Sequence, residues 1–321
     1  MNALQLEKIG SLQLKETHTS ETKPGEILLK VTHCAVCRTD AKMWERGQRD
    51  LVLPRVLGHE ICGISEESGK RFAVWPGSAC GHCEDCRRGT ENLCREMQII
   101  GFHKDGGFAE YVAVPESSLI PIPDDLPGEI ASLAEPLACA INGLRQIRVR
   151  EEERILIYGA GSVGLLTGLA VSAQNASPFI REIRPDRLTR SEVFRDRIGM
   201  TCAEDCKEHR FDAAINAAPS SDTFLQGLSA LRPGGRFCLF SGLIDDQPIP
   251  VPAINEIHYR QLRIAGAYGC TAAQMKAALN ILADHKNDVK LLIEDHITLE
   301  QVPHILPKIL AGEAFKFVVD V

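Results

Sequence analysis

The N-terminal third of the chain consists of short apolar or alternating runs separated by glycine and proline, a pattern typical of β-strands. Three such runs are residues 25–37, 70–76 and 107–115. Between residues 129 and 149, apolar positions instead recur every three or four residues, which predicts a helix. Pro136 lies inside that segment and predicts a kink or a break.

From residue 154 onwards, strand-like and helix-like segments alternate. Residues 154–158 form a short apolar run, followed by a glycine-rich turn at 159–164 and an apolar helix at 165–174. Such alternation predicts a parallel sheet with helices on both faces. Further strands are expected at residues 179–183, 211–217, 235–242, 262–269 and 316–321, and a further helix at 272–285.

Composition narrows the class of protein. With 321 residues, 44% of them hydrophobic and 25% charged, the chain has the size and balance of a globular protein of two domains. The net charge of −7 does not suggest binding to nucleic acid or to an anionic membrane. No apolar stretch approaches the ~20 residues of a membrane span, and no signal peptide is evident. The twelve cysteines therefore predict metal binding and buried thiols in a reducing cytoplasm.

Four cysteines lie close together, at Cys80, Cys83, Cys86 and Cys94. Their C-x2-C-x2-C-x7-C spacing lets a short loop place four thiolates around one ion. Two disulfides or an iron–sulfur cluster would use the same residues, but such closed sites are most typical of structural zinc. A closed site leaves no position for substrate, so catalysis must be sought elsewhere.

The glycine-rich turn has the Gly-x-Gly-x-x-Gly pattern of a dinucleotide-binding site, with Gly159, Gly161, Ser162, Val163 and Gly164. Because it follows a strand and opens a helix, backbone N–H groups and the helix dipole can receive a pyrophosphate there. An ordinary glycine-rich turn is the alternative, which an acidic residue further along the chain disfavours.

That acidic residue is Glu182, 23 positions after Gly159. A carboxylate at the end of the second strand can accept hydrogen bonds from both ribose hydroxyls and repels a 2′-phosphate, which favours NAD over NADP. Arg181, Arg184 and Arg187 occupy the same stretch. An arginine could instead bind a 2′-phosphate, so NADP stays open as the alternative.

Cys37, His59 and Glu60 are a second set of candidate metal ligands, from two separate segments. A catalytic zinc needs three protein ligands and a position left open for water or substrate. On spacing alone, these residues could equally be a buried thiol, a core histidine and a surface carboxylate.

These motifs together resemble those of a known family. The chain is similar to the zinc-dependent medium-chain dehydrogenase/reductase superfamily, the alcohol dehydrogenase family, and most similar to its polyol (sorbitol) and threonine dehydrogenase branch. The matching motifs, in the family's order, are CRTD at 37–40, GHE at 58–60, the cysteine loop at 80–94, GGFAEYV at 106–112, AEPLACA at 134–140, YGAGSVG at 158–164 and LRPGGR at 231–236.

The resemblance implies an α/β protein: a GroES-like β-rich catalytic domain and a Rossmann domain with a doubly wound parallel sheet, with the active site in the cleft between them. The catalytic domain is expected at residues 1–130 and includes the zinc loop at 80–94. The NAD-binding domain and its connecting helix are expected at 131–268, and residues 269–321 are expected to return to the catalytic domain. Relatives imply a homodimer or a homotetramer.

The resemblance also implies the catalytic zinc ligands. Cys37 and His59 correspond to two of them. Glu60 corresponds to the third, with Glu135 as an alternative or water-mediated ligand, as in the polyol branch. Two zinc ions per chain are therefore expected, one catalytic and one structural.

Residues near the substrate take their roles from the same resemblance. Thr39 corresponds to the residue that passes the hydroxyl proton towards the nicotinamide ribose, although it could be the N-cap of a helix at 40–47. Arg38 corresponds to an arginine that binds the pyrophosphate in liver-type enzymes. Lys42 replaces a relay histidine, and could relay protons, attract an anionic substrate or be a surface lysine. Trp44 corresponds to an aromatic residue of the substrate pocket, or packs in the core.

Taken together, these roles imply an NAD-dependent zinc dehydrogenase that takes a hydride from a secondary alcohol, such as a polyol, a sugar derivative or an amino alcohol. Arg46 and Arg49 lie near Lys42 and support an anionic substrate. An NADPH-dependent ketone or aldehyde reductase is one alternative. A non-catalytic NAD-sensing protein is another, but it would be expected to lose the open zinc site, whose candidate residues are all present.

Overall fold

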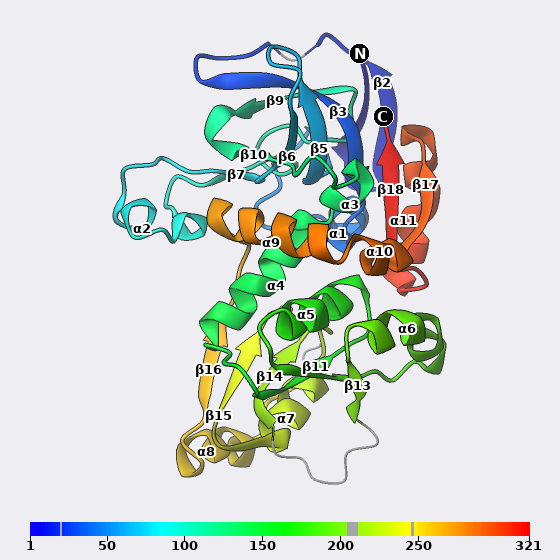
Figure 1. Cartoon of the computed structure of the whole chain (residues 1–321). Helices are drawn as coiled ribbons and strands as arrows, with labels where there is room; N and C mark the ends of the chain where they lie inside the picture. The colour runs from blue at the N-terminus through cyan, green and yellow to red at the C-terminus, as the bar shows by residue number, and fades with distance from the viewer. Residues whose placement is uncertain (20, 204–210, 245–246) are drawn as a thin grey trace. The chain divides into compact units, whose positions relative to one another are not determined.

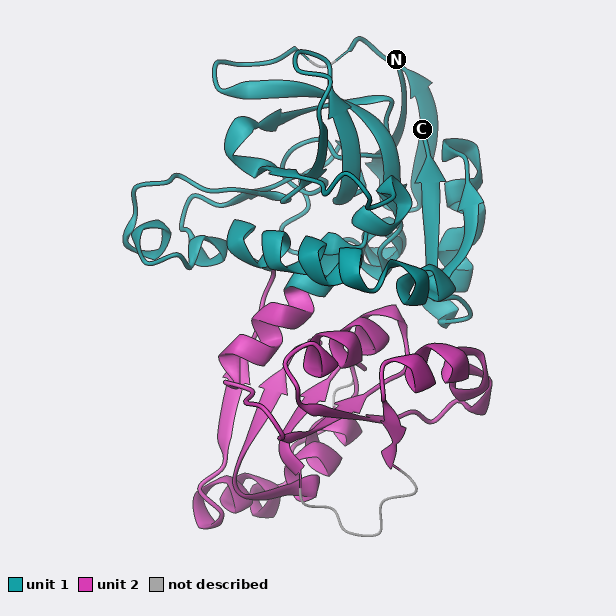
Figure 2. Cartoon of the chain, in the orientation of Figure 1, with its two compact units in different colours: residues 1–138, 270–321 teal, residues 139–269 magenta. Residues whose placement is uncertain are grey.

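The structure is a computed structural model that describes residues 1–19, 21–203, 211–244 and 247–321. The chain folds into two compact units, shown in different colours in Figure 2. Unit 1 comprises Met1–Ala138 and Cys270–Val321, and unit 2 comprises Cys139–Gly269. No described helix has the length and apolar character needed to cross a membrane.

Unit 1 is built mainly from strands, with short helices between them (Figure 1). Its elements in chain order are β1 (Asn2–Lys8), β2 (Ser11–Glu16), β3 (Glu26–Ala35), α1 (Arg38–Arg46), β4 (Arg55–Val56), β5 (Glu60–Ser65), β6 (Arg71–Val74), β7 (Gly77–Ser78), α2 (Glu84–Arg87), η1 (Glu91–Leu93), β8 (Gln98–Ile99), β9 (Tyr111–Pro115), η2 (Glu116–Ser118), β10 (Leu119–Pro121), α3 (Gly128–Ala131), α4 (Ala134–Gln146, which continues into unit 2), α9 (Ala272–Asp284), α10 (Lys286–Val289), η4 (Lys290–Leu292), β17 (Ile293–Ile297), η5 (Leu299–Gln301), α11 (Val302–Ala311) and β18 (Lys316–Asp320).

Strand β3 is the centre of unit 1, because it pairs antiparallel with β5, β9 and β18 in a seven-stranded sheet. Its register places Ala35 opposite Glu60 of β5 and opposite Val318 of β18. Alternate β3 residues such as Leu29 and Val31 are fully buried in the core of the unit. The end of β3 is therefore bordered by Glu60 on one side and, on the other, by Val318 from the C-terminal strand.

Gly58 turns the chain from β4 into β5. Its φ of +92° lies in the left-handed region that favours glycine. A Cβ at this position would lie 2.8 Å from Phe108 Cδ1 and 2.9 Å from Cys34 Sγ, closer than packing permits. The glycine of the GHE motif is therefore required by the packing that holds His59 and Glu60.

Unit 2 alternates strands and helices. Its elements after α4 are β11 (Arg154–Tyr158), α5 (Ser162–Ser172), β12 (Ser177–Arg181), α6 (Pro185–Arg197), β13 (Thr201–Cys202), β14 (Phe211–Asn216), α7 (Ser221–Ala230), β15 (Leu231–Leu239), α8 (Val251–Tyr259) and β16 (Arg263–Gly266).

The six strands of unit 2 form one sheet in the order β13-β12-β11-β14-β15-β16, and every neighbouring pair is parallel. The order reverses between β11 and β14, which is the switch point of a doubly wound sheet, where such folds bind dinucleotides. Right-handed crossovers that run in opposite directions place α5 and α7 on opposite faces. The fold class predicted from the sequence, a Rossmann sheet and a GroES-like domain, is confirmed.

Several predicted boundaries shift by a few residues. Helix α5 begins at Ser162 and not at residue 165, because the glycine-rich turn leads directly into the helix. The predicted break lies between α3 and α4, and Pro136 occupies the first turn of α4. Proline is tolerated there because the backbone N–H groups of a first turn have no partner within the helix.

Candidate active site and zinc centres

Cys37 lies where β3 ends and α1 begins, and it is the N-cap of α1. Its Sγ accepts a hydrogen bond from Thr39 N at 3.4 Å, while its own N–H donates to Asp40 Oδ2 at 2.8 Å. Cysteine binds metals as the thiolate. Thr39 is the second residue of the helix, so the alternative that it is the N-cap is wrong.

Asp40 joins the two segments of this site and was not singled out from the sequence. Its fully buried carboxylate accepts from Gly58 N at 3.3 Å, and Oδ1 lies 3.3 Å from His59 Nδ1. This approach to Nδ1 lacks hydrogen-bond geometry, and among the described residues Nδ1 has no other partner. A carboxylate beside Nδ1 orients the ring so that Nε2 can bind a metal.

The candidate ligand atoms of Cys37, His59 and Glu60 all lie within 4.8 Å of one another. Burial by itself would lower the pKa of His59, but the negative charges of Asp40 and Cys37 outweigh it and hold that pKa well above its usual value. One sulfur, one nitrogen and one carboxylate oxygen, largely buried, suit a zinc ion with a fourth position open. The residues present therefore fit a catalytic zinc.

Glu60 has a partner that the sequence did not suggest. Lys316 Nζ, on the C-terminal strand β18, lies 2.5 Å from both Glu60 carboxylate oxygens and 3.3 Å from the Val36 carbonyl oxygen. Both members of the pair are buried. Burial raises the pKa of Glu60, with a smaller contribution from Glu135, while Lys316 opposes the rise.

Glu135 lies in the first turn of α4, outside the cluster of Cys37, His59 and Glu60. Its charge nevertheless acts on that cluster, because it raises the pKa of both Glu60 and Lys316. The structure thus places two carboxylates near one lysine, and only one of them is held directly by that lysine.

The four-cysteine loop forms a compact sulfur cluster. All four Sγ atoms lie within 4.8 Å of one another, with 3.5 Å between Cys83 and Cys86 and 3.9 Å between Cys80 and Cys86. A tetrahedral zinc with bonds of about 2.3 Å requires sulfurs about 3.8 Å apart. The N–H groups of Cys80 and Glu96 donate to Cys94 Sγ, each at 3.4 Å. The spacing of the four sulfurs therefore fits a closed zinc site.

The thiols of this loop have unequal acidities. Hydrogen bonds, the strongest with the Cys86 backbone, lower the pKa of Cys83 to about 6. Desolvation and the hydrogen bond with the Cys83 side chain raise the pKa of Cys86 to about 12. A zinc ion requires all four as thiolates, so metal binding must displace the proton that Cys86 retains.

The three glycines of the glycine-rich turn in unit 2 have different structural surroundings. Gly159 has a φ of +101°, and a Cβ on Gly164 would lie 1.8 Å from the Gly159 carbonyl oxygen. A Cβ on Gly161 would meet no atom within 4 Å, so this side of the turn is open. Gly161 is also the N-cap of α5, and no side chain caps the N–H groups of Ser162 and Val163. The open turn and these N–H groups fit a dinucleotide pyrophosphate.

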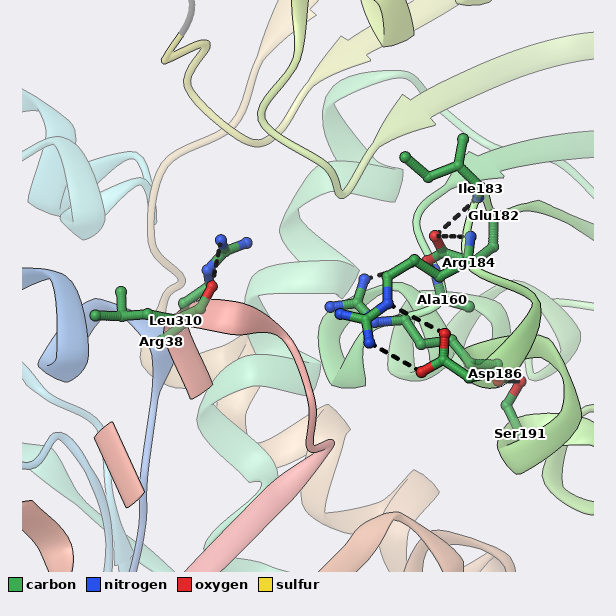
Figure 3. A network of polar contacts seen from close by, with 9 residues as sticks. Arg38, Ala160, Glu182, Ile183, Arg184, Asp186, Ser191 and Leu310 are labelled. Atoms are coloured by element: carbon green, nitrogen blue, oxygen red, sulfur yellow. Dashed lines mark hydrogen bonds and ion pairs between the residues drawn. The ribbon is translucent and has the colours of Figure 1, made fainter. Parts of the chain in front are cut away.

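Glu182 follows β12 and organises this turn (Figure 3). Its Oε2 accepts from Ala160 N at 2.7 Å, and its Oε1 accepts from Ile183 N and Arg184 N at 2.8 and 3.0 Å. Arg187 Nη1 lies 3.3 Å from Oε2. The arginines are also engaged, since Arg184 pairs with Asp186 at 2.9 Å. Glu182 is therefore buried and held by protein donors at the position expected for a ribose contact.

The remaining predicted residues lie on α1. Arg38 is exposed and donates to the Leu310 carbonyl oxygen at 3.1 Å. Lys42 is half-buried, and burial together with the positive charges of Arg38 and Arg46 lowers its pKa. Trp44 is half-buried and packs against the core of unit 1. The role of the Thr39 hydroxyl in proton transfer stays a prediction.

Comparison with known proteins identifies relatives of this chain. The family model of the alcohol dehydrogenase GroES-like domain matches residues 23–124. An L-threonine 3-dehydrogenase of Chelativorans sp. is 26% identical over 335 residues, covering 96% of this chain and 95% of that protein. A D-altritol 5-dehydrogenase of Agrobacterium fabrum is 28% identical over 318 residues, covering 94% of each. A zinc-binding dehydrogenase of Sinorhizobium meliloti 1021, solved with NADP bound, superposes with a TM-score of 0.88 at 26% identity, covering 100% of this chain and 99% of that one.

Fold, metal-binding residues and dinucleotide turn together define a zinc-type, nicotinamide-dependent dehydrogenase. The chain belongs to the zinc-dependent medium-chain dehydrogenase/reductase superfamily, in the branch of the threonine and polyol dehydrogenases.

Proposed function

We propose that the protein oxidises a secondary alcohol of a polyol, a sugar derivative or an amino alcohol, with NAD as hydride acceptor. The observation that carries this proposal is the cluster of one thiol, one imidazole and one carboxylate within 4.8 Å at the end of β3. Relatives that align with 94% or more of this chain act, by name, on L-threonine and D-altritol, both hydroxyl-bearing molecules.

In this proposal, Cys37, His59 and Glu60 hold the catalytic zinc, and Glu135 is the alternative or water-mediated ligand. A bound zinc supplies Lewis-acid polarisation, which makes a substrate hydroxyl easier to ionise near neutral pH. Asp40 holds the His59 ring in the orientation that presents Nε2. Thr39, anchored beside Cys37 by its backbone N–H, would accept the hydroxyl proton while its own hydroxyl proton passes on towards the nicotinamide ribose.

Lys316 decides how Glu60 can act. With both carboxylate oxygens at 2.5 Å from Lys316 Nζ, Glu60 is fixed in position. Such a carboxylate is a weak metal ligand unless it turns away from Lys316, which leaves room for Glu135 or water. The arrangement supports a site whose third ligand exchanges.

The coenzyme part of the proposal rests on unit 2. The open turn at Gly161 and the N-terminus of α5, with Ser162 and Val163, receive the pyrophosphate. Glu182 accepts the ribose hydroxyls, which favours NAD. A bound nicotinamide supplies the hydride acceptor, and the protein contributes position and electrostatics.

A second candidate is an NADP-dependent reductase of ketones or aldehydes. It is favoured by Arg187, which lies 3.3 Å from Glu182, and by the relative solved with NADP. The Glu182 carboxylate beside Arg187 would repel a 2′-phosphate, so we place NAD first.

The test combines zinc content with initial rates of NAD and NADP reduction over a panel of secondary alcohols, polyols and their phosphates. About two zinc ions per chain and NAD reduction with a polyol are expected. About one zinc ion and no turnover with any alcohol would leave only the four-cysteine loop metallated and would reject the proposal.

A further inference from the structure

Three basic residues of α1 lie on one face of the helix. Arg38, Lys42 and Arg46 are spaced four residues apart, so their side chains follow one another along that face. Each step advances about 6 Å along the helix axis. Like charges at this spacing destabilise a helix, and here they occur in a chain of net charge −7. A compensating anion would explain why they are tolerated.

In the described part of the protein, no acidic side chain pairs with Lys42 or Arg46. The groups that act on the Lys42 ammonium are Arg38 and Arg46, which disfavour its charge, and the Cys37 thiol, which favours it. Within the described parts of the chain, neither Lys42 nor Arg46 forms an ion pair or a hydrogen bond. Helix α1 contains two acidic residues. Asp40 is committed to Cys37, Gly58 and His59, and Glu45 is exposed and forms no ion pair with a described residue.

Neighbouring cations differ in this respect. Arg38 is tied to the Leu310 carbonyl oxygen, and Arg49 lies 3.3 Å from Asp50. Lys42 is half-buried, so its charge is less screened than that of an exposed lysine. It is also close enough to Cys37 for the two to interact electrostatically. Lys42 lies five residues after the candidate zinc ligand Cys37, about 7.5 Å further along the helix axis, so one small substrate could span the distance between them.

We propose that Lys42 and Arg46 bind an anionic group, a phosphate or a carboxylate, of the alcohol that the protein oxidises. This inference rests on the proposed function and narrows it from alcohols in general to alcohols with an acidic group a few bonds away from the reacting hydroxyl. Arginine and lysine both suit such a group, through paired N–H donors and as a point charge respectively.

The first test compares kcat/KM for sorbitol, sorbitol 6-phosphate and gluconate in the zinc-loaded enzyme. At least one anionic substrate is expected to exceed the neutral polyol by about tenfold or more, because charge-assisted hydrogen bonds contribute about that much or more. The Lys42→Gln and Arg46→Gln variants should each lower this anionic-to-neutral ratio by about ten- to hundredfold. Arg49→Gln is the matched control and should leave the ratio unchanged.

The coenzyme also contains phosphates, so its KM is measured in the same variants. A rise confined to the KM of the anionic substrate supports the inference. A rise confined to the KM of NAD would assign the two cations to the coenzyme and overturn it. A wild-type enzyme that prefers sorbitol over both anions would also overturn it, while leaving the proposed function intact.

A binding measurement keeps the inference testable if none of these alcohols is oxidised. Inorganic phosphate is titrated calorimetrically into the coenzyme-free wild-type protein and into the Lys42→Gln/Arg46→Gln double variant, whose melting temperatures are compared to exclude misfolding. Binding to the wild type that weakens tenfold or more in the variant supports the anion site. Equal binding, or none to the wild type, rejects it whatever the outcome for turnover.

Discussion

Single residues decide how charge is held around the candidate catalytic zinc. The Glu60–Lys316 pair is buried and comes from two strands that flank β3, so its desolvation is offset only by the close contact of the two groups. Removing one member would leave the other charge buried without compensation. We therefore expect this pair to affect both the stability of unit 1 and the choice of the third zinc ligand.

We predict that Lys316→Met destabilises the metal-free protein by about 3–5 kcal/mol, since this is typical when one partner of a buried ion pair is removed. Denaturant unfolding of the wild type and the variant measures the loss. Adding Glu60→Gln should recover part of it, because the uncompensated charge is then gone. Additive effects of the two substitutions would show that the pair is not coupled.

Repeating the comparison with zinc distinguishes the two candidate ligands. If Glu60 binds the metal once Lys316 is absent, the loss caused by Lys316→Met should become smaller in the zinc-loaded protein. If Glu135 is the ligand, zinc should leave the loss unchanged.

Asp40 makes a prediction about pH. In the metal-free protein it helps to raise the pKa of His59 above the usual value of 6.5. A group whose pKa is higher in the folded state than in the unfolded state stabilises the fold fully at pH values below its unfolded-state pKa. This stabilisation is lost as the pH rises from that value through the folded-state pKa. The EDTA-treated wild type should therefore lose stability between pH 6 and pH 9 by more than the Asp40→Asn variant does. Urea unfolding at pH 6 and at pH 9 measures this loss. An equal loss of unfolding free energy in the wild type and in Asp40→Asn would contradict the prediction.

Asp40 and Lys316 show what sequence reasoning could not reach at this scale. Cys37, His59 and Glu60 were found because their residue types are metal ligands. Asp40 acts through hydrogen bonds across a turn, and Lys316 reaches Glu60 only because β18 pairs with β3. A lone lysine at the start of an apolar strand is a signal for such a buried partner, but it does not name the partner.

At the scale of elements, helices and strands with strong apolar patterns were predicted more reliably than the points at which other elements begin. The strands at 154–158 and 316–320 and the helix at 272–284 have strong apolar patterns and appear in the structure almost as expected. Strand β15 begins at Leu231, earlier than predicted, although Pro233 and two glycines lie in it. The sequence at the start of β15 lacks the apolar alternation of a strand. Pairing of Leu231 with Phe211 of β14 stabilises the extended conformation there.

The four-cysteine loop should be an independent stabilising element. Cys83→Ala is predicted to lower the melting temperature by about 10 °C or more, because structural zinc contributes directly to folding and each kcal/mol shifts a protein of this size by about 2–4 °C. EDTA treatment of the wild type should produce a similar shift. Cys238→Ala, a buried cysteine of unit 2, is the control and should retain full zinc content. An unchanged melting curve for Cys83→Ala would exclude the structural role.

The turn between β11 and α5 makes a prediction about the coenzyme. Glu182→Ala should raise the KM for NAD by about tenfold or more and change the KM for the alcohol much less, because the ribose loses a charge-assisted hydrogen bond. Glu182→Gln is the control for local structure, since its amide oxygen can still accept from Ala160 N. Arg187→Gln should leave the KM for NAD nearly unchanged. A larger effect of that variant on NADP than on NAD would favour the alternative coenzyme.

At the scale of the whole molecule, the candidate zinc ligands and the candidate dinucleotide turn belong to separate compact units. The candidate zinc ligands Cys37, His59 and Glu60 lie in unit 1, whereas Glu182 and the glycine-rich turn lie in unit 2 (Figure 2). Unit 2 is continuous in sequence, and unit 1 is completed by the C-terminal segment that carries Lys316. Loss of a ligand in one unit should therefore leave binding in the other unit intact.

Cys37→Ala and Glu182→Ala test this separation. Cys37→Ala should reduce the zinc content from about two ions per chain to about one and abolish turnover, yet bind NADH as the wild type does. Glu182→Ala should keep both zinc ions and bind NADH about tenfold more weakly. Metal analysis and NADH fluorescence titration measure the two properties without relying on turnover. If Cys37→Ala also weakened NADH binding tenfold, the two sites would be energetically coupled, and turnover losses in either variant could no longer be assigned to one unit.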